Sequence, residues 1–255
     1  MILDEIILNK RQEIDALKER FAGKDPLKLV EELSQARAFL KKGKFSLIAE
    51  IKKASPSAGL IKQDYNPTTL GKVYEEGGAS AISVLTDGKY FQGKLGHIKA
   101  AKDSTTVPIL RKDFILDETQ IYESRIAGAD ALLLIVRVLK NAELVKLIEL
   151  TESLGMQTLV ETHSAEEARR ALRAGAKIIG INNRDLDTLE IDLQNTVRIM
   201  SEIPELKKRI IISESGIKTK EDVLVLQQVG VDGVLIGETL LKSDNIPAKI
   251  RELIG

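Results

Sequence analysis

Short apolar runs rich in β-branched residues recur along the chain and alternate with longer segments that have a helical period. Eight such runs occur, at SLIAEI near residue 46, SAISVLT near 80, VPILRKDF near 107, ALLLIV near 131, MQTLVE near 156, KIIGIN near 177, RIIISES near 209 and DGVLIG near 232. A continuous apolar run is typical of a parallel strand that is covered on both faces. Segments such as NAELVKLIELTESLG and SAEEARRALRAGA are long enough to be the helices that connect these strands.

An alternation of strand and helix that closes after eight units predicts an α/β fold, the (β/α)8 TIM barrel. A repeat supports the barrel, because EGGASAISVLT, AGADALLLIV, AGAKIIGIN and VGVDGVLIG each place glycine at a helix end just before an even-numbered strand. A doubly wound open sheet is the competing architecture. No GxGxxG motif follows the first strand, so the barrel is favoured.

Residues 1–45 precede the first strand and are predicted to form an N-terminal helical extension that packs on the barrel, with 46–255 as a single barrel domain. Apolar residues form one face of the first helix: Leu3, Ile6, Ile7, Ile14, Leu17 and Phe21. Asp25 and Pro26 then supply the cap and the first position of a second helix. Two hypotheses remain open for the first helix, which is either a plug at one barrel end or a lid over a functional site.

Composition and charge narrow the classes of function. Lys and Arg number 38 and Asp and Glu also number 38, so neither a nucleic acid nor an anionic membrane is expected as partner. The chain has no cysteine, which removes disulfides, thiolate nucleophiles and cysteine-ligated metals and fits a reducing compartment. No segment approaches the roughly 18 apolar residues of a membrane span, and the N-terminal segment lacks signal-peptide features. We therefore expect a cytoplasmic protein that acts on a small molecule.

Charged residues stand at the carboxyl ends of the odd-numbered strands, where the strands should still be buried. Side chains alternate along a strand, so Glu50 and Lys52 share an inward face, and the same parity directs Lys112, Glu161 and Glu214 inward. Alternate strands fill one interior layer, so these groups are expected to meet at the end where barrels place their sites. A solvated strand end is the alternative for each residue alone, but burying unpaired ions is costly and favours a ligand-facing cluster. Two polar residues of the sixth strand are expected at the rim: Asn182 and Arg184.

Two sharp turns, SESGI and LIGETLL, follow the seventh and eighth strands, where barrels often bind phosphate. Backbone N–H groups at Gly216 and Gly237, the hydroxyl of Ser215 and a short helix opening at Glu238 favour an anion there. Ordinary turn chemistry is the alternative. The carboxylate of Glu238 must point away if an anion binds at this place.

The two histidines, His97 and His163, are predicted to have surface or capping roles. Each lies in a helix or off the end of a strand, without a partner at the spacing of metal ligands. Carboxylates can hold Mg²⁺, but the lysines at the same mouth of the barrel compete with a cation. We therefore expect no metal.

Seven motifs on seven of the predicted strands belong together: AEIKKASPSAG, LRKDF, LLIV, LVETH, GINNRDL, SESGI and LIGETLL. In this order they resemble indole-3-glycerol phosphate synthase of tryptophan biosynthesis. The resemblance covers essentially the whole chain, including the helical extension, and KKASPS with LRKDF and INNRDL is highly specific. It implies a cofactor-free lyase that converts 1-(2-carboxyphenylamino)-1-deoxyribulose 5-phosphate to indole-3-glycerol phosphate, water and carbon dioxide. Its expected partners are this phosphorylated substrate and other tryptophan-pathway enzymes.

The resemblance also implies roles for individual residues. Lys112 is expected to be the general acid at the ketone oxygen, with Glu161 as a general base or electrostatic partner. Lys52 and Glu50 are expected to serve carboxylate binding and the later dehydration, and the division of acid–base steps among these four residues stays open. The other matching positions are expected around the substrate (Ser55, Asn182, Arg184 and Glu214), its aromatic ring (Phe114 and Leu133) and its phosphate (Ser215, Gly216, Gly237 and Glu238).

Two positions depart from the family pattern. Gly88 stands where a larger or acidic residue is usual, which affects rate more than reaction type, and Thr162 stands where Val is common.

Three rival functions remain. Phosphoribosylanthranilate isomerase shares the scaffold, but its chemistry would use a cysteine. An engineered retro-aldolase would use Lys112 or Lys52 as a Schiff-base nucleophile. A silent scaffold barrel predicts loss of the charged cluster.

Overall fold

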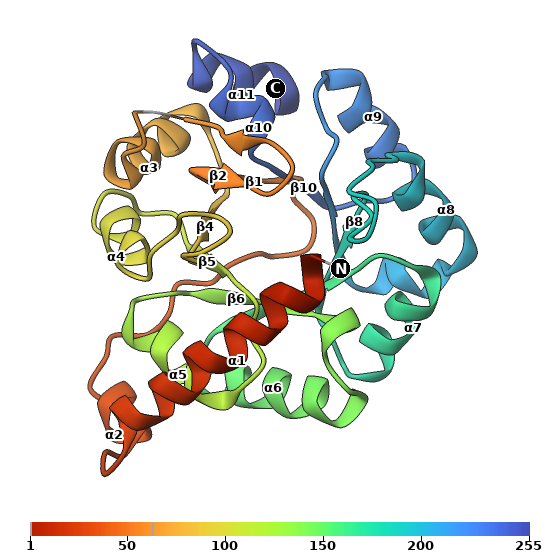
Figure 1. The fold of residues 1–255 in the computed structure, drawn as a ribbon. Coiled ribbons are helices and arrows are strands. Elements are labelled where there is room, and N and C mark those ends of the chain that lie inside the picture. Colours follow the sequence, from red (N-terminus) through yellow and green to blue (C-terminus); the bar gives the residue numbers. More distant parts are fainter. Residues whose placement is uncertain (1, 63) are drawn as a thin grey trace.

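The computed structural model describes residues 2–62 and 64–255 and contains the predicted barrel, closed by eight parallel strands (Figure 1). Around the barrel the strands are β1 (Ser46–Ile51), β10 (Gly233–Ile236), β9 (Ile210–Glu214), β8 (Ile178–Asn182), β7 (Gln157–Thr162), β6 (Ala131–Ile135), β5 (Ile109–Lys112) and β4 (Ala81–Leu85). Pairing of β1 with both β10 and β4 closes the ring. A small antiparallel hairpin follows β1 and consists of β2 (Ala54–Ser55) and β3 (Gly59–Leu60).

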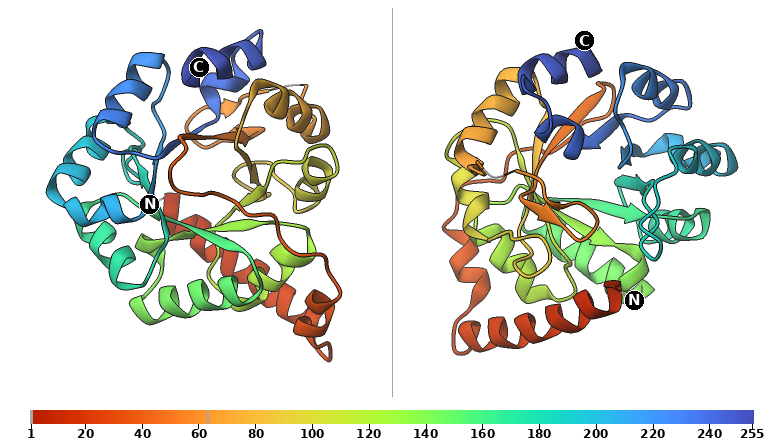
Figure 2. Two further views of the ribbon diagram at one scale, coloured as in Figure 1. Left: turned by 180° about the vertical axis from the view of Figure 1, so that it is seen from behind. Right: turned by 45° about the horizontal axis from the view of Figure 1, so that its top comes forward.

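Helices surround the strands on the outside of the barrel (Figure 2). They are α3 (Pro67–Gly77), α4 (Gly96–Lys102), α5 (Glu118–Ile126), α6 (Asn141–Ser153), α7 (Ala165–Arg173), α8 (Gln194–Glu202), α9 (Lys220–Gln228), α10 (Glu238–Leu241) and α11 (Ile246–Ile254), with 3₁₀ turns η1 (Val136–Val138) and η2 (Pro204–Lys208). Several of these helices start at a capping residue, since the side chains of Asn66, Ser164 and Thr219 each accept a backbone N–H of the first turn of α3, α7 and α9. Within the described residues, no helix is both long and apolar enough to cross a membrane.

The barrel interior is filled by apolar residues from alternate strands. Ile48, Leu110, Leu159 and Ile212 belong to one buried cluster inside the ring, and each lies two residues before an inward charged residue. Their neighbours along the strands, such as Leu47, pack outward against the helices. The period of two along each strand therefore places the charged layer on top of an apolar floor.

The amino-terminal end of the barrel is closed by the segment that follows α2 (Pro26–Glu31). Phe39 and Leu40 join the interior cluster, and their backbone N–H groups donate to Oε1 of Gln157 at 2.6 and 3.3 Å. Gln157 is the first residue of β7, so this contact fixes the segment below the strands. The plug is thus a linker and not the first helix.

Helix α1 (Ile2–Phe21) lies at the opposite end, running beside α5 with its amino terminus toward the barrel mouth (Figure 1). Leu3, Ile6, Ile14 and Leu17 are buried as predicted. The same face also buries Lys10, which a pattern of apolar positions does not predict. The first helix therefore faces the functional end, as the lid hypothesis requires.

Candidate active site

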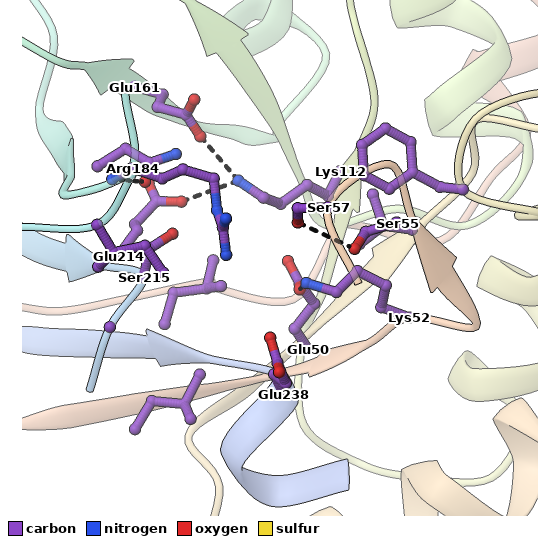
Figure 3. Close-up of a pocket in the computed structure, with 18 of the residues that line it drawn as sticks. Glu50, Lys52, Ser55, Ser57, Lys112, Glu161, Arg184, Glu214, Ser215 and Glu238 are labelled. Atoms are coloured by element: carbon purple, nitrogen blue, oxygen red, sulfur yellow. Dashed lines mark hydrogen bonds and ion pairs between the residues drawn. The ribbon is translucent and has the colours of Figure 1, made fainter. Parts of the chain in front are cut away.

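A pocket of about 570 Å³ opens at the carboxyl ends of the strands, and every site residue predicted from the sequence lines it (Figure 3). These residues are Glu50, Lys52, Ser55, Lys112, Phe114, Leu133, Glu161, Asn182, Arg184, Glu214, Ser215, Gly216, Gly237 and Glu238. The structure thus brings them together, and their individual roles stay predictions. The pocket has a charged floor, an apolar wall and a cationic edge.

The floor is built around Lys112 at the end of β5. Its Nζ lies 2.8 Å from Oε2 of Glu161 on β7 and 2.8 Å from Oε2 of Glu214 on β9 (Figure 3). Both carboxylates are buried, whereas the lysine side chain is 14% exposed and reaches the pocket. The inward parity predicted for these three strands is therefore correct.

Burial and charge pairing give the three groups different proton affinities. Burial alone would lower the pKa of Lys112, but Glu161, Glu214 and Glu50 raise it well above its usual value. Burial opposes ionisation of Glu161, yet Lys112 and His163 hold its pKa well below the usual range. For Glu214, burial together with the charge of Glu161 outweighs Lys112 and raises the pKa to about 7. Lys112 therefore stays protonated and Glu161 stays ionised at neutral pH, whereas Glu214 gains and loses its proton near neutral pH.

A second ion pair joins Lys52 to Glu50 on β1, with Nζ to Oε1 at 2.6 Å. The hydroxyl of Tyr74 donates to the backbone oxygen of Glu50 at 2.9 Å and fixes this strand end from outside the barrel. Glycine leaves room opposite, because a Cβ at Gly237 would lie 2.6 Å from Oε1 of Glu50 and would displace this carboxylate. The charged end of β1 is thus held in place on both sides.

Gly180 inside β8 lies against the Glu214 carboxylate, a contact that was not identified from the sequence. A Cβ at Gly180 would lie 2.1 Å from Oε1 of Glu214, so only glycine leaves room for this carboxylate. That oxygen is buried and has no hydrogen-bond partner among the described residues. A lone glycine in an apolar strand run was the available signal.

The rim is formed by the loop after β8, as predicted. Oδ1 of Asn182 accepts the backbone N–H of Arg184 at 3.0 Å, and Nη1 of Arg184 donates to the backbone oxygen of Leu189 at 3.0 Å. These contacts fix the arginine, whose guanidinium projects into the pocket (Figure 3). It is placed to bind an anionic or hydroxylated ligand.

The predicted anion edge lies at the ends of β9 and β10. Ser215 and Gly216 both have positive φ, 68° and 86°, which turns the chain sharply and suits glycine at the second position. Nδ2 of Asn183 holds this turn by donating to the backbone oxygen of Ser215 at 3.1 Å. The carboxylate of Glu238 pairs with Nζ of Lys242 at 2.6 Å, so its charge is balanced. Three lysines at this edge were not identified from the sequence: Lys218, Lys242 and Lys249.

The apolar wall combines predicted and unpredicted residues. Phe114 and Leu133 line it as expected, and the ring of Phe91 lies 6.4 Å from that of Phe114 between centroids. Ile2, Leu3 and Ile6 of α1 complete the wall. The apolar period of α1 does not predict that this helix reaches the pocket, because the contact depends on how the extension packs on the barrel.

His163 lies directly behind the floor, so the surface role predicted for it is wrong, whereas its contacts with Glu167 in the first turn of α7 fit the capping role that was the other alternative. Its Nε2 is 3.3 Å from Oε1 of Glu161 and its Nδ1 is 3.3 Å from Oε2 of Glu167, with the side chain 9% exposed. Residues 161 and 163 share strand parity, which was the available signal. His97 is half-buried and its Nδ1 lies 3.1 Å from the Tyr65 hydroxyl. Across residues 2–62 and 64–255, no group of three or more acidic or histidine side chains is placed to hold a metal.

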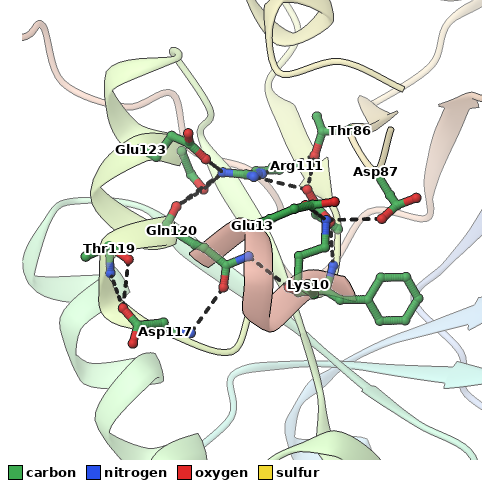
Figure 4. A network of polar contacts seen from close by, with 12 residues as sticks. Lys10, Glu13, Thr86, Asp87, Arg111, Asp117, Thr119, Gln120 and Glu123 are labelled. Atoms are coloured by element: carbon green, nitrogen blue, oxygen red, sulfur yellow. Dashed lines mark hydrogen bonds and ion pairs between the residues drawn. The ribbon is translucent and has the colours of Figure 1, made fainter. Parts of the chain in front are cut away.

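A buried network ties α1 to the loops that carry the site (Figure 4). Nζ of Lys10 lies 2.8 Å from Oδ1 of Asp113 and 3.1 Å from Oδ2 of Asp87, and all three side chains are almost fully buried. Asp113 separates Lys112 from Phe114 and also accepts a hydrogen bond from Arg111 at 3.0 Å. Lys10 therefore couples the position of α1 to that of the β5 end.

Replacing Lys10 by methionine is expected to lower the free energy of unfolding by about 3–5 kcal/mol, because Asp87 then stays buried without a cation and Asp113 keeps only Arg111. Equilibrium urea unfolding measures this change. Lys18→Met is the matched control, since Lys18 on the same helix pairs with Asp117 while 52% exposed and should cost at most about 1 kcal/mol. Equal stability of the two variants would contradict a structural role for Lys10.

Fold and site together define a (β/α)8-barrel enzyme whose pocket, at the carboxyl ends of the strands, is lined by paired lysines and carboxylates. A family model described as indole-3-glycerol phosphate synthase matches residues 3–253. The chain belongs to the indole-3-glycerol phosphate synthase family.

Relatives agree with this assignment, and a solved structure agrees with the fold. The indole-3-glycerol phosphate synthase of Acetivibrio thermocellus is 47% identical over 258 residues, covering 99% of this chain and 98% of the relative. That of Aquifex aeolicus is 50% identical over 209 residues, covering 82% and 81%. A crystal structure of KGPDC from Streptococcus mutans matches with a TM-score of 0.64 at 13% identity, covering 83% of this chain and 96% of that one. The last similarity shows the barrel fold alone.

Proposed function

We propose that the chain converts 1-(2-carboxyphenylamino)-1-deoxyribulose 5-phosphate to indole-3-glycerol phosphate, carbon dioxide and water. The observation that carries the proposal is the position of Lys112, between two buried carboxylates and beside an apolar wall, in a chain of this family. The pocket supplies each feature that the substrate requires. These are an anion edge, a flat apolar surface, cations for a carboxylate and an acid for a carbonyl oxygen.

The substrate is proposed to lie across the pocket from the anion edge to the apolar wall. Its phosphate binds at Ser215, Gly216 and Gly237 near the lysines of that edge. Its aromatic ring packs between Phe114 and Leu133. The ketone between these ends then comes within reach of Lys112, which orients the reacting carbon toward the ring.

Ring closure is proposed to use Lys112 as the general acid. The ring carbon that bears the carboxylate attacks the ketone carbon, and the ketone oxygen takes a proton from Nζ as the new C–C bond forms. Glu161 and Glu214 keep Nζ protonated until that moment, and Glu161 balances its charge. The closed ring is a cationic iminium, so the carboxylate leaves as carbon dioxide and its electron pair restores the aromatic ring.

Dehydration completes the reaction and is proposed to involve the Lys52–Glu50 pair. The hydroxyl formed from the ketone leaves as water after protonation, and a carboxylate removes a proton from the neighbouring carbon. Lys52 and Glu50 lie 2.6 Å apart and both reach the pocket, so one can donate while the other accepts. Before this step Lys52 balances the charge of the substrate carboxylate.

The reaction predicts a fixed stoichiometry. Substrate labelled with ¹³C in the carboxylate should release one labelled carbon dioxide for each indole formed, because decarboxylation is required to restore aromaticity. Isotope-ratio mass spectrometry with parallel indole absorbance measures both products. Indole formation without labelled carbon dioxide, or isomerisation without either, would contradict the proposal.

Arg184→Ala is expected to raise KM about 10–100-fold with little change in kcat. This ratio corresponds to the free energy of one charge-assisted hydrogen bond to the substrate. The guanidinium is fixed at the rim and points into the pocket but lies outside the floor cluster. Steady-state kinetics measure both constants. Arg198→Ala is the control, because Arg198 pairs with Asp192 at an exposed position. An unchanged KM in Arg184→Ala would exclude this role.

A further inference from the structure

His163 joins the site to a chain of alternating charges that extends beneath the floor. It is the first residue after β7, and Asn195 on α8 donates to its backbone oxygen at 3.1 Å. Its own backbone N–H donates to Oε2 of Glu167 at 2.7 Å. Both backbone groups of His163 are therefore fixed, which leaves the imidazole one defined place between two carboxylates.

The imidazole faces a carboxylate on each side. Nε2 is 3.3 Å from Glu161 and Nδ1 is 3.3 Å from Glu167, and the side chains are 9%, 3% and 15% exposed in the order His163, Glu161, Glu167. A neutral imidazole has one N–H and one lone pair, so it would direct a lone pair at one of the carboxylates. The doubly protonated ring presents an N–H and a positive charge to both carboxylates: Nδ1 is within hydrogen-bond distance of Glu167, and Nε2 lies at ion-pair distance from Glu161 without a hydrogen bond.

Two cations of neighbouring elements lie beyond these carboxylates, and their charges oppose protonation of the ring. Lys112 of β5 lies beyond Glu161, and Arg137 of η1 is electrostatically coupled to Glu167. Burial by itself would lower the pKa of His163, but its contacts with Glu161 and Glu167 raise the pKa to about 9. The ring is thus charged over the whole neutral range, and the positive form is lost only as the pH rises through about 9.

We propose that His163 is a positioning residue for the reaction, a buried imidazolium that holds Glu161 in the orientation in which its other oxygen binds Lys112. The proposal rests on the function proposed above for Lys112. It also assigns a part to Glu167, which holds the imidazole from the side away from the pocket. Glu161 is then fixed between two cations, whereas Glu214 has Lys112 alone.

The direct test is the titration of the two histidines by NMR of ¹⁵N-labelled imidazoles in the intact protein. The chain contains His97 and His163 as its two histidines, so spectra of His97→Gln assign both sets of signals. We expect His163 to titrate at about 9 and to shift downward in Glu167→Gln. A neutral His163 at pH 7 would overturn the proposal. This readout does not depend on turnover, so it stays informative even if the proposed function fails.

Kinetics test the consequence for the site. His163→Gln keeps an N–H donor but loses the charge, and we expect kcat to fall about 10-fold, through misplacement of Glu161, with KM nearly constant. The wild type should lose activity above about pH 9, and this alkaline limb should be absent in His163→Gln and displaced to lower pH in Glu167→Gln. His97→Gln is the control, since its ring contacts Tyr65 outside the pocket. Wild-type kcat and an unchanged pH profile in His163→Gln would overturn the proposal.

Discussion

Replacing Lys112 by alanine is expected to lower kcat at least about 10³-fold, because the acid that protonates the ketone oxygen is lost. Glu161 and Glu214 both pair with Nζ of Lys112, so the substitution removes the acid together with the cation that the two carboxylates share. The barrel should stay folded, since Glu214 already has a pKa of about 7 and can take up a proton when its cation is removed. The charge left beneath the pocket is then that of Glu161 alone, beside His163.

Stopped assays of indole formation, with circular dichroism to monitor folding, measure the effect of Lys112→Ala. Lys146→Ala is the matched control, because Lys146 is exposed on α6 and forms a surface ion pair with Glu118. Its turnover should equal that of the wild type. If Lys112→Ala is folded and retains near-normal turnover, Lys112 is not the general acid.

Glu161→Gln is expected to reduce kcat about 10²-fold while KM changes little. The amide can still accept a hydrogen bond from Lys112, but it carries no charge to balance the ammonium and cannot take up a proton. The loss therefore affects the transition state more than substrate binding. In addition, His163 loses one of the two carboxylates that keep it protonated, so its pKa should fall below 9.

Steady-state kinetics and the imidazole titration together measure the Glu161→Gln variant. The same substitution at exposed Glu149 of α6 provides the control for the chemical change. Retention of kcat within about threefold of the wild type would show that Glu161 has neither an acid–base nor an electrostatic role.

The charge state of Lys112 separates the proposed lyase from a Schiff-base aldolase. A Schiff-base lysine must lose its proton before it attacks a carbonyl carbon, and such residues usually have a lowered pKa. Here Glu161 and Glu214 raise the pKa of Lys112 well above its usual value despite burial. The cluster favours a proton donor over a nucleophile. Its complete set of ion pairs also argues against a silent scaffold.

The strand ends could be predicted from the sequence because β geometry fixes which side chains share a face. Glu50, Lys112, Glu161 and Glu214 each follow an inward apolar residue by two positions, and eight apolar runs determine where the strands lie. Predicting the positions of these four side chains does not require the conformations of the loops. The floor of the pocket therefore follows from local periodicity together with barrel closure.

Other parts of the site depend on contacts between segments that are distant in the chain. Lys10 interrupts the apolar face of α1 and is buried only because Asp87 and Asp113 meet it there. Lys218 reaches the pocket from the loop after β9 and Lys249 from α11, and the apolar period of these segments does not predict that either side chain faces the pocket. His163 differs from these, since its parity with Glu161 was visible and was not used.

The most direct measurement of the central claim is indole fluorescence after the carboxyphenylamino-deoxyribulose phosphate is added to purified, EDTA-treated protein. The proposed reaction predicts a rising signal that depends on enzyme concentration and is absent in Lys112→Ala. It also predicts that adding Mg²⁺ back leaves the rate unchanged, which tests the expectation that no metal takes part. A folded protein that binds this substrate and yields no indole signal would contradict the proposed reaction.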